Sequence, residues 1–373
     1  MKKIVYRQIA KDCTKFFLLT IFTISIIIWV LQAVNYLDFV IEDGHGFIVY
    51  FKYTLLSFPK IFSRIFPFAI FLAFTYVLLK YENKNELVIF WNFGIKKISF
   101  INFFIKFSII FLLLSLILNA IITPIAQNKA RSFLRSSDLN FFENILKPKK
   151  FIDTIKNLTI YFDEQNEKGE LKNIFLSNSS QITFAKTGKF EKRQNRKVFV
   201  LYNGKTINNN NGKISEFNFS KTDFNIANFN SKTTTHQKTQ ENSTVELIRC
   251  LLILEDIGIK LVTRKIPQIN NCIIRNLENI YEELYLRLIK PLYVTFLITI
   301  SLLLILKSKD DYTFKFYKLK IYSFGFLFIV FLETSSKLIT KNIFQNVCLS
   351  LLPFVLVVFA YVYFLRKLKI NKL

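Results

Sequence analysis

The sequence of 373 residues has few of the residues and motifs that enzymes and metalloproteins use for chemistry. It contains two histidines, which lie far apart, and four cysteines, which form no CxxC or other metal-binding spacing. It also lacks the GxxxxGK[ST] loop of ATP-binding proteins, the GxSxG turn of hydrolases and the HExxH helix of zinc proteases. The sequence therefore gives no support to a metal site, to ATP binding by this chain or to catalysis.

Acidic residues are also scarce, because 26 Asp and Glu stand against 51 Lys and Arg, a formal net charge of +25. In a soluble protein such an excess would suggest nucleic-acid binding. This chain, however, is 51% hydrophobic, and its cations gather at the ends of long apolar runs, where they set topology and contact anionic lipid. Because no nucleic-acid recognition motif accompanies the charge, we predict a membrane protein that binds no nucleic acid.

Six apolar runs are long enough to cross a bilayer. They cover about residues 16–37, 47–80, 98–123, 288–306, 321–338 and 347–365. The basic N-terminus and the basic tail 366–369 predict that both chain ends are cytoplasmic. Pro59 and Pro67 are predicted to kink the second span, and Pro124 is predicted to end the third.

A polar region lies between the third and fourth spans, and alternation of the spans places it outside. We therefore predict three parts, 1–127, 128–283 and 284–373, with a β region at about 148–227. Short alternating runs indicate strands, and Asn203-Gly204 and Asn211-Gly212 are typical of turns. Such strands predict a sandwich or open barrel. Residues 228–243 are polar and predicted to be mobile, and a helical pattern follows to residue 283.

A short amphipathic helix is predicted at about 83–95, between the second and third spans. Gly94 ends it, because glycine adopts the left-handed cap conformation cheaply. It is flanked by four lysines, which place it in the cytoplasm: Lys80, Lys84, Lys96 and Lys97. One interpretation is an interfacial helix on the lipid headgroups; the other is a helix that receives a push from a cytoplasmic partner.

Charged residues inside the spans are candidates for headgroup contact, because charge at membrane depth is costly. Lys60 and Arg64 are four residues apart on one helix face, which suits the phosphates of an anionic lipid; snorkelling to the headgroups is the alternative. Glu333 and Lys337 are also four apart and can pair, or Lys337 can contact a headgroup. Cys250 and Cys272 can pair, although their spacing does not establish it.

Two classes of function remain open at this point. One is the membrane subunit of a transporter whose energy comes from a separate ATPase. The other is a non-transporting membrane anchor or assembly factor that displays the outer β domain. The short cytoplasmic helix favours the transporter.

The order of these parts resembles a known family, the LptF/LptG (YjgP/YjgQ) permeases of lipopolysaccharide export. The resemblance covers essentially the whole chain and rests on four local motifs: Tyr53–Pro59 with Phe66–Phe68, Asn85–Val88 with Phe93–Ile95, Leu158–Phe162 with Gly169–Leu171, and Glu283–Leu284 with Arg287–Leu292. The first hairpin and the segment Asn203–Phe224 are more similar to LptF than to LptG.

The resemblance implies an α-helical inner-membrane protein with six transmembrane helices and an inserted periplasmic β-jellyroll. It implies an LptG-type partner, an LptB-type ATPase dimer that hydrolyses ATP, LptC and LptA-type bridge proteins, lipopolysaccharide as cargo and no cofactor. Glu86 matches the carboxylate of the family's coupling helix, with Leu87, Val88, Trp91 and Gly94 as expected groove contacts.

Gln32 and Asn35 stand where some relatives carry cations, which leaves Lys60, Arg64 and Lys337 as the headgroup candidates. Strand alternation gives candidates for an acyl-chain track: Ile160, Phe162, Ile174, Leu176, Phe184, Val198, Val200, Phe217 and Phe219. A register shift of one residue would move such a set to the other face of the sheet.

Overall fold

The computed structural model describes residues 2–37, 47–137, 148–155, 158–166, 169–178, 181–193, 196–210, 213–225, 238–254 and 271–370. The chain divides into two compact units. The helical unit comprises Met1–Leu31, Leu56–Lys129 and Gln237–Leu373, and the sheet unit comprises Gln32–Leu55 and Ala130–His236.

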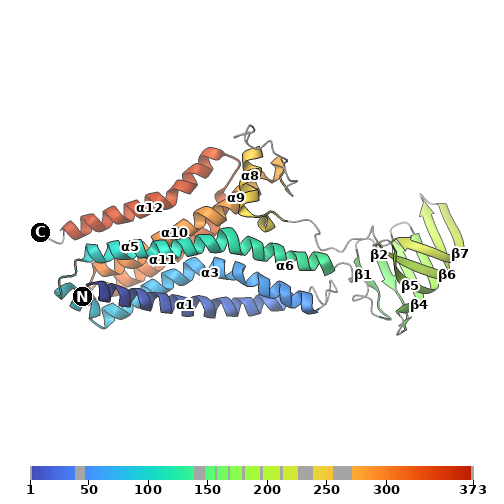
Figure 1. The fold of residues 1–373 in the computed structure, drawn as a ribbon, viewed down its shortest axis with the longest axis horizontal. Coiled ribbons are helices and arrows are strands. Elements are labelled where there is room, and N and C mark those ends of the chain that lie inside the picture. Colours follow the sequence, from blue (N-terminus) through green and yellow to red (C-terminus); the bar gives the residue numbers. More distant parts are fainter. Residues whose placement is uncertain are drawn as a thin grey trace. The chain divides into compact units, whose positions relative to one another are not determined.

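Within the described residues, six helical stretches are long and apolar enough to span a membrane, which confirms the predicted number (Figure 1). The stretches are Lys3–Asn35, Phe47–Asn83, Lys97–Leu134, Ile274–Leu306, Phe314–Leu338 and Ile343–Leu368. Their main helices are α1 (Lys2–Asn35), α3 (Phe47–Asn83), α5 (Lys97–Ile117), α10 (Tyr293–Leu302), α11 (Phe314–Ser335) and α12 (Ile343–Ile370).

The helix of the third span does not end at Pro124. After α5 the helix widens into a π-turn, η1 (Leu118–Ile122), and continues as α6 (Thr123–Ser137), with Pro124 in the first turn. A proline is tolerated there, but it leaves the carbonyl of Ala120, four residues earlier, without its usual donor. The hydroxyl of Thr244 donates a hydrogen bond to this carbonyl instead. The helix thus continues past Pro124, with a side chain from a distant segment bonded to its backbone there.

The fourth span contains a second π-turn. The helix α9 (Leu277–Leu284) leads into η6 (Tyr285–Ile289), then η7 (Lys290–Leu292), α10 and η8 (Leu303–Leu306). The two π-turns, η1 and η6, pack against each other. Such turns are frequent at functional sites.

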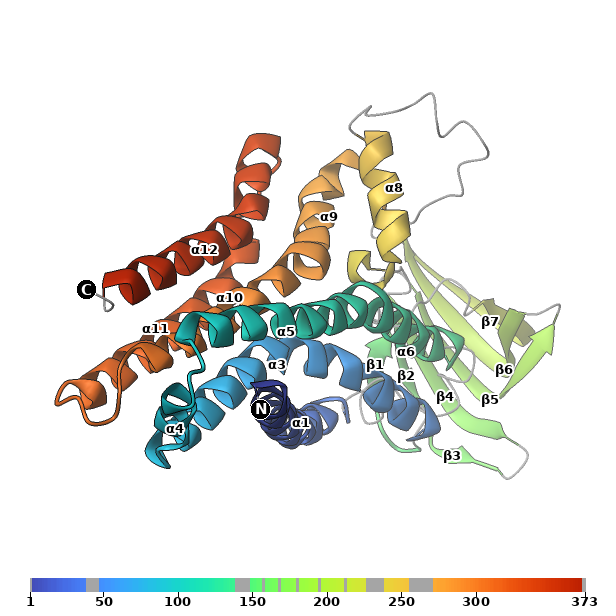
Figure 2. The ribbon, with the colours of Figure 1, turned by 60° about the vertical axis from the view of Figure 1, so that its left-hand side comes forward.

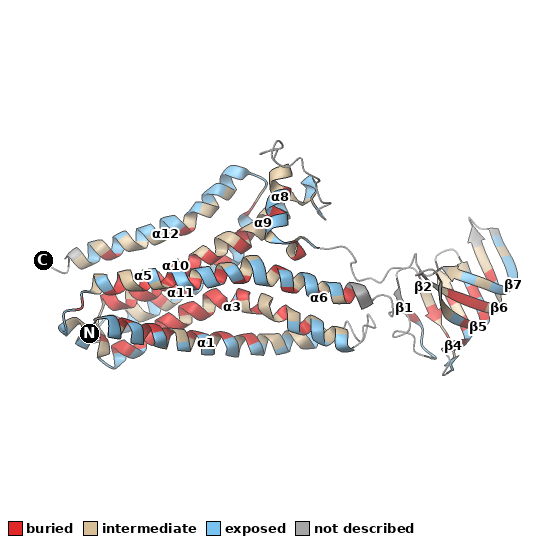
Figure 3. Cartoon of the chain, in the orientation of Figure 1, coloured by how far each residue is buried: buried red, intermediate tan, exposed pale blue. Residues whose placement is uncertain are grey.

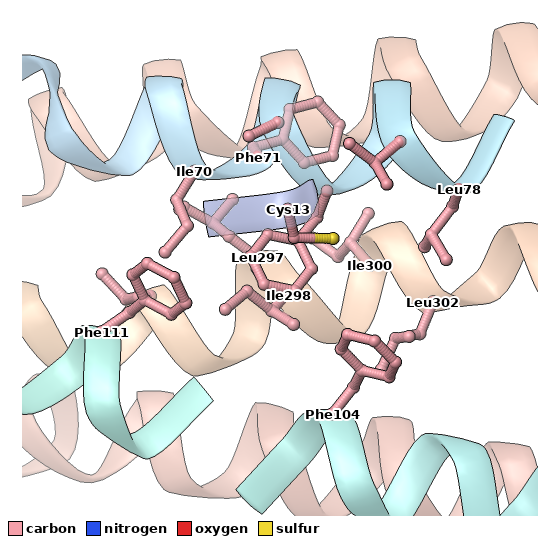
Figure 4. Packing of buried hydrophobic residues seen from close by; sticks show 14 of the residues in the cluster. Cys13, Ile70, Phe71, Leu78, Phe104, Phe111, Leu297, Ile298, Ile300 and Leu302 are labelled. Atoms are coloured by element: carbon pink, nitrogen blue, oxygen red, sulfur yellow. The ribbon is translucent and has the colours of Figure 1, made fainter. Parts of the chain in front are cut away.

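A phenylalanine-rich core holds the helical unit together. α10 is buried over all its ten residues, and Phe71, Phe104 and Phe111 pack around Leu297 and Ile300 (Figures 3 and 4). In contrast, α12 keeps a largely exposed apolar surface, which suits contact with lipid or with another membrane protein.

The sheet unit contains one antiparallel sheet in the order β1-β2-β4-β5-β6-β7, with β3 also paired to β4. The strands are β1 (Ile152–Ile155), β2 (Leu158–Tyr161), β3 (Glu164–Gln165), β4 (Glu170–Asn178), β5 (Gln181–Arg193), β6 (Arg196–Asn210) and β7 (Lys213–Asn225). All the described strands belong to this sheet, so the jellyroll remains a prediction.

The sequence pattern predicts a turn at Asn203-Gly204, but the structure places these two residues inside β6. Gly204 pairs with Ala185 on one side and with Phe219 on the other. Asn203 adopts a left-handed conformation with φ of 51°. Asn203 and Gly204 therefore form a local bend within the strand instead of a turn, because pairing with strands on both sides outweighs their preference for turns. Asn211-Gly212 lies outside the described residues.

The segment predicted to be mobile is structured in its described part. Residues 226–237 lie outside the described residues, but Thr239–Glu241 forms a short 3-10 helix, η4. Glu241 and Asn242 are buried, and α8 (Thr244–Leu254) follows directly. A disulfide joins Cys250 of α8 to Cys272, before α9.

We predict that Gly204→Ala destabilises the protein by about 1 to 3 kcal/mol, the usual cost of overpacking. A Cβ atom at this position would lie 2.1 Å from the backbone oxygen of Phe184, which cannot move without breaking the β5–β6 pairing. Thermal unfolding of the detergent-solubilised protein measures the effect. Gly169→Asn is the control, because Gly169 has a positive φ and open space around it. An unchanged melting temperature for Gly204→Ala would contradict the strand register.

Candidate functional site

A polar cavity of about 330 Å³ lies among the helices of the helical unit. Its walls come from α3, from the α5–α6 helix, from the α9–η7 stretch, from α11 and from η9 (Ser336–Leu338). Three carboxylates line it, and five cations outnumber them: Lys60, Arg64, Arg287, Lys290 and Lys337. The cavity therefore carries an excess of positive charge inside an otherwise apolar bundle.

Three of the five cations already have partners. Arg287 pairs with Glu283 at 2.9 Å, and Lys290 pairs with Glu333 at 2.6 Å. Lys60 donates a hydrogen bond of 3.4 Å to the side-chain oxygen of Gln240. Arg64 and Lys337 are exposed, and within the described part of the chain neither has a carboxylate at ion-pair distance. These two side chains are available to an anionic ligand.

Glu333 and Lys337 do not pair, although their spacing in sequence permits it. Lys337 lies beyond the end of α11, in the 3-10 turn η9, where the geometry that brings residues i and i+4 together is lost. Glu333 binds Lys290 instead. This leaves Lys337 as a cavity cation, and its contact with a headgroup stays a prediction.

The cavity lies far from the end of α3 that leads to the predicted coupling helix. About 19 residues separate Arg64 from Asn83, which at about 1.5 Å per residue corresponds to roughly 28 Å. This distance is close to the thickness of the hydrocarbon core of a bilayer. The two candidate regions therefore lie at opposite ends of the spans.

Arg287 organises one wall of the cavity, a role that the sequence pattern does not predict. It is 3% exposed and donates hydrogen bonds to the backbone oxygens of Asn242 (2.8 Å) and Gln240 (3.0 Å) and to the hydroxyl of Thr244 (3.2 Å). It thus fixes the segment that supplies Gln240 to the cavity and Thr244 to the third span. The sequence signal that indicates such a role is an arginine at the start of an apolar run.

The predicted cytoplasmic helix is present as α4 (Glu86–Asn92). Gly94 has φ of 75°, its N–H donates to the oxygen of Trp91, and the N–H of Ile95 donates to the oxygen of Phe90. These two bonds are the Schellman arrangement, so Gly94 ends the helix as expected.

The apolar side chains that α4 exposes are not the ones predicted as groove contacts. Leu87 is fully buried in the chain's own core, and the ring of Trp91 packs against that of Phe100, with centroids 5.6 Å apart. Glu86 and Val88 are half-buried. The exposed apolar side chains are Ile89 (47%) and Phe93 (64%), four residues apart. They, and not Leu87 or Trp91, form the outward face of this helix.

The sheet has a crease that changes which residues share a face. Asn173, Lys186, Asn203 and Ser220 lie side by side on β4, β5, β6 and β7, and the ladder pairs are interrupted at each of them. Asn173 and Asn203 are both left-handed, with φ of 51°. Across the crease, residues on one face are three apart instead of two.

The predicted acyl-chain candidates lie on both faces of this creased sheet. We call the face that carries the buried cluster the inner face. Five candidates contribute to it: Ile160, Phe162, Ile174, Leu176 and Phe219. Phe217, two residues before Phe219, shares this face but is 58% exposed.

The other three candidates alternate with inner-face residues and so lie on the opposite face: Phe184, Val198 and Val200. Beyond the crease the inner-face residues are Leu171, Phe199 and Leu201, which simple alternation from Phe217 and Phe219 misses.

The opposite face carries an open groove of about 680 Å³ at the crease. Phe184 lines it, and its ring lies 5.2 Å from that of Phe175. Hydrogen bonds from the amide of Asn173 (2.8 Å) and the hydroxyl of Tyr161 (2.9 Å) hold the pKa of the Asp163 carboxyl below its ordinary value. These bonds also help to keep Asn173 in its left-handed conformation.

Comparison with known proteins agrees with the layout of the chain. A search of curated proteins finds no match. The family model described as the lipopolysaccharide export system permease LptF/LptG matches residues 7–367, nearly the whole chain. The chain therefore belongs to the LptF/LptG family, whose members are the permease components of the lipopolysaccharide export transporter.

Proposed function

We propose that this chain is the LptF-type permease subunit that lifts lipopolysaccharide out of the inner membrane and passes it to the periplasmic bridge. The observation that carries the proposal is the cavity at the end of the spans remote from α4, with two cations, Arg64 and Lys337, that pair with no carboxylate of the described residues. Lipopolysaccharide has phosphates on a sugar headgroup, and guanidinium and ammonium groups are their natural partners. The similarity of the first hairpin to LptF supports the subtype.

The proposed orientation places the cavity and the sheet unit on the periplasmic side, with α4 and both termini in the cytoplasm. The Cys250–Cys272 disulfide supports this, because disulfides persist in the periplasm and are rare in the cytosol. The basic tail and the lysines around α4 support it through the positive-inside bias.

The partners that family membership implies have matching features in this chain. The exposed Ile89 of α4 and Phe93, which caps that helix, suit insertion into an apolar groove of an LptB-type ATPase. Glu86, in the first turn of α4, suits a basic group beside that groove. The lipid-exposed helices suit an LptG-type permease as the second wall of the cavity. An LptC and an LptA-type protein would continue the sheet of a periplasmic β-jellyroll.

The proposed mechanism is mechanical. ATP binding closes the ATPase dimer, α4 moves, and the cavity narrows around the lipid. Each methylene taken out of the bilayer costs about 0.8 kcal/mol, so an apolar route must receive the acyl chains. The inner face of the sheet, with Leu201, Phe199 and Phe219, offers that route.

A photo-crosslinking residue in place of Leu201 or Phe219 is expected to capture lipopolysaccharide in the assembled exporter when ATP is supplied. The same residue in place of Phe184, on the opposite face, is the matched control and is expected to capture several-fold less. The crosslinked product is detected by its shift on a gel and by antibody against the lipid. Equal capture from both faces would contradict the assignment of the inner face, and capture at neither would contradict the proposed function.

A further inference from the structure

Two charged side chains flank α4 and bind the same neighbouring segment. Glu82, in the last turn of α3, is 4% exposed, and its carboxylate accepts a hydrogen bond of 2.8 Å from the backbone N–H of Lys309. Lys97, the first residue of α5, donates a hydrogen bond of 3.1 Å to the backbone oxygen of Ile305. One residue precedes α4 and the other follows it, and both hold the end of the fourth span.

The segment that they hold is residues 305–313, which end the fourth span and connect α10 to α11; we call it the connection. The side chain of Lys309 returns a hydrogen bond of 3.2 Å to the backbone oxygen of Asn83. Within the connection, Asp311 accepts hydrogen bonds from the backbone N–H (2.9 Å) and hydroxyl (2.8 Å) of Thr313. The connection, which lies near α4 in Figure 2, is therefore bonded to the chain on both sides of α4, to Glu82 and Asn83 before it and to Lys97 after it.

The contacts of Glu82 and Lys97 are well suited to transmit force. Both side chains are charged and bond backbone atoms, and charge-assisted hydrogen bonds are about twice as strong as neutral ones. Because Glu82 is almost fully buried, its carboxylate has no water to replace a lost partner. The opposite charges of Glu82 and Lys97 also attract each other across the base of α4. These bonds therefore resist separation of the connection from the two residues that flank α4.

The far ends of α10 and α11 lead to the cavity. Lys290 lies in η7, immediately before α10, and Glu333 lies in the last turn of α11, and these two form the 2.6 Å ion pair of the cavity wall. Lys337 follows in η9. The connection thus joins, at the α4 end of the bundle, the two helices that carry cavity charges at the other end.

A further contact joins α3 to α1, because the hydroxyl of Tyr81 donates to the carboxylate of Asp12 at 2.7 Å. This hydrogen bond involves only the α3 side of α4, whereas the connection is held at Ile305 and at Lys309 by residues on both sides of α4. The fourth and fifth spans are therefore the elements that α4 is best placed to move.

We propose that Glu82 and Lys97 form a clamp that carries the movement of α4 to the α10–α11 connection, and through these two helices to the cavity. The clamp rests on the proposed function, because it describes how the same permease couples ATP hydrolysis to lipid extraction. Glu82 and Lys97 are positioning residues. They touch neither ATP nor lipid, and they determine how much lipid is moved for each ATP consumed.

The test uses the complete exporter, purified with its ATPase and reconstituted in vesicles containing lipopolysaccharide. Glu82→Ala and Lys97→Met each remove one contact of the clamp. ATPase association and ATP hydrolysis are expected to stay within about twofold of wild type, whereas lipid released per ATP falls about tenfold, a typical coupling effect. Glu82→Gln keeps an acceptor oxygen and is expected to restore most of the release. Asp310→Asn, on the exposed side of the connection, is the matched control and is expected to behave as wild type.

Wild-type release per ATP in both clamp variants would overturn the clamp and leave the proposed function intact. Loss of ATPase association in these variants would also overturn it, because the residues would then serve assembly. Absence of ATP-dependent release from the wild-type complex itself would instead contradict the proposed function. The melting temperature of each complex shows whether a variant is folded, and Lys97→Met, on a less buried residue, tests the clamp if Glu82→Ala does not fold.

Discussion

Replacing Ile89 and Phe93 together with aspartate is expected to abolish the association of the ATPase with this permease. The two side chains are 47% and 64% exposed and lie four residues apart on the outward face of α4. Burying each of them in a groove is worth about 1.5 to 3 kcal/mol, so losing both weakens binding by at least about a hundredfold. A buried aspartate in their place adds a desolvation cost.

Co-purification of the ATPase with the tagged permease measures this effect. Asn92→Asp is the matched control, because Asn92 is an exposed polar residue of the same helix and the change adds the same charge without removing an apolar contact. Leu87→Asp would not be informative, because Leu87 belongs to the core and its replacement would disturb the fold itself. Normal recovery of the ATPase with the double variant would show that α4 binds through another surface.

Removing the charges of Arg64 and Lys337 is expected to strip the exporter of bound lipopolysaccharide. Hydrogen bonds to charged groups are worth about 1.5 to 3 kcal/mol each, so Arg64→Gln with Lys337→Gln weakens binding by on the order of a hundredfold or more. The fold is expected to stay intact, since in the described structure neither cation pairs with a carboxylate of the chain.

The measurement is the amount of lipopolysaccharide that remains with the purified complex at low and high salt. Lys341→Gln is the control, because Lys341 is exposed, follows η9 closely and does not line the cavity. The wild type is expected to lose lipid as salt rises, and the double variant to hold little at any salt concentration. Equal amounts of bound lipopolysaccharide in the double variant and the wild type would show that the cavity cations do not hold the lipid.

The sequence predicted the spans and the short helix between the second and third spans because these depend on local patterns. Apolar runs of bilayer length, flanking lysines and a capping glycine each carry their own signal. The pairing of Lys290 with Glu333 had no such signal, since the two are on different spans and the i,i+4 spacing pointed to Lys337. The choice between Leu87 and Ile89 as the outward residue also depended on the neighbouring helices, because both faces of α4 are apolar.

In the sheet, too, the predictions that depended on local pattern succeeded and those that depended on tertiary contacts failed. Alternation correctly assigned Ile160 and Leu176 to the inner face, on one side of the crease. It failed at Val198 and Val200, because the left-handed Asn203 shifts the pattern by one residue between them and Phe219. An asparagine followed by glycine favours a turn in isolation, and only the strands paired on both sides convert it into a bend. A tertiary effect of this kind cannot be predicted from strand periodicity.

The central claim is that this chain has no energy source of its own and converts movement received at α4 into expulsion of a lipid. The most direct measurement is transfer of lipopolysaccharide from vesicles containing the purified exporter to a soluble periplasmic acceptor protein. Transfer is expected to require this chain, the ATPase and ATP together, and to stop when Ile89 and Phe93 are replaced with aspartate. Recovery of this chain alone from its native membrane, with neither ATPase nor lipopolysaccharide and with no ATP-dependent transfer, would contradict the account and favour a membrane anchor.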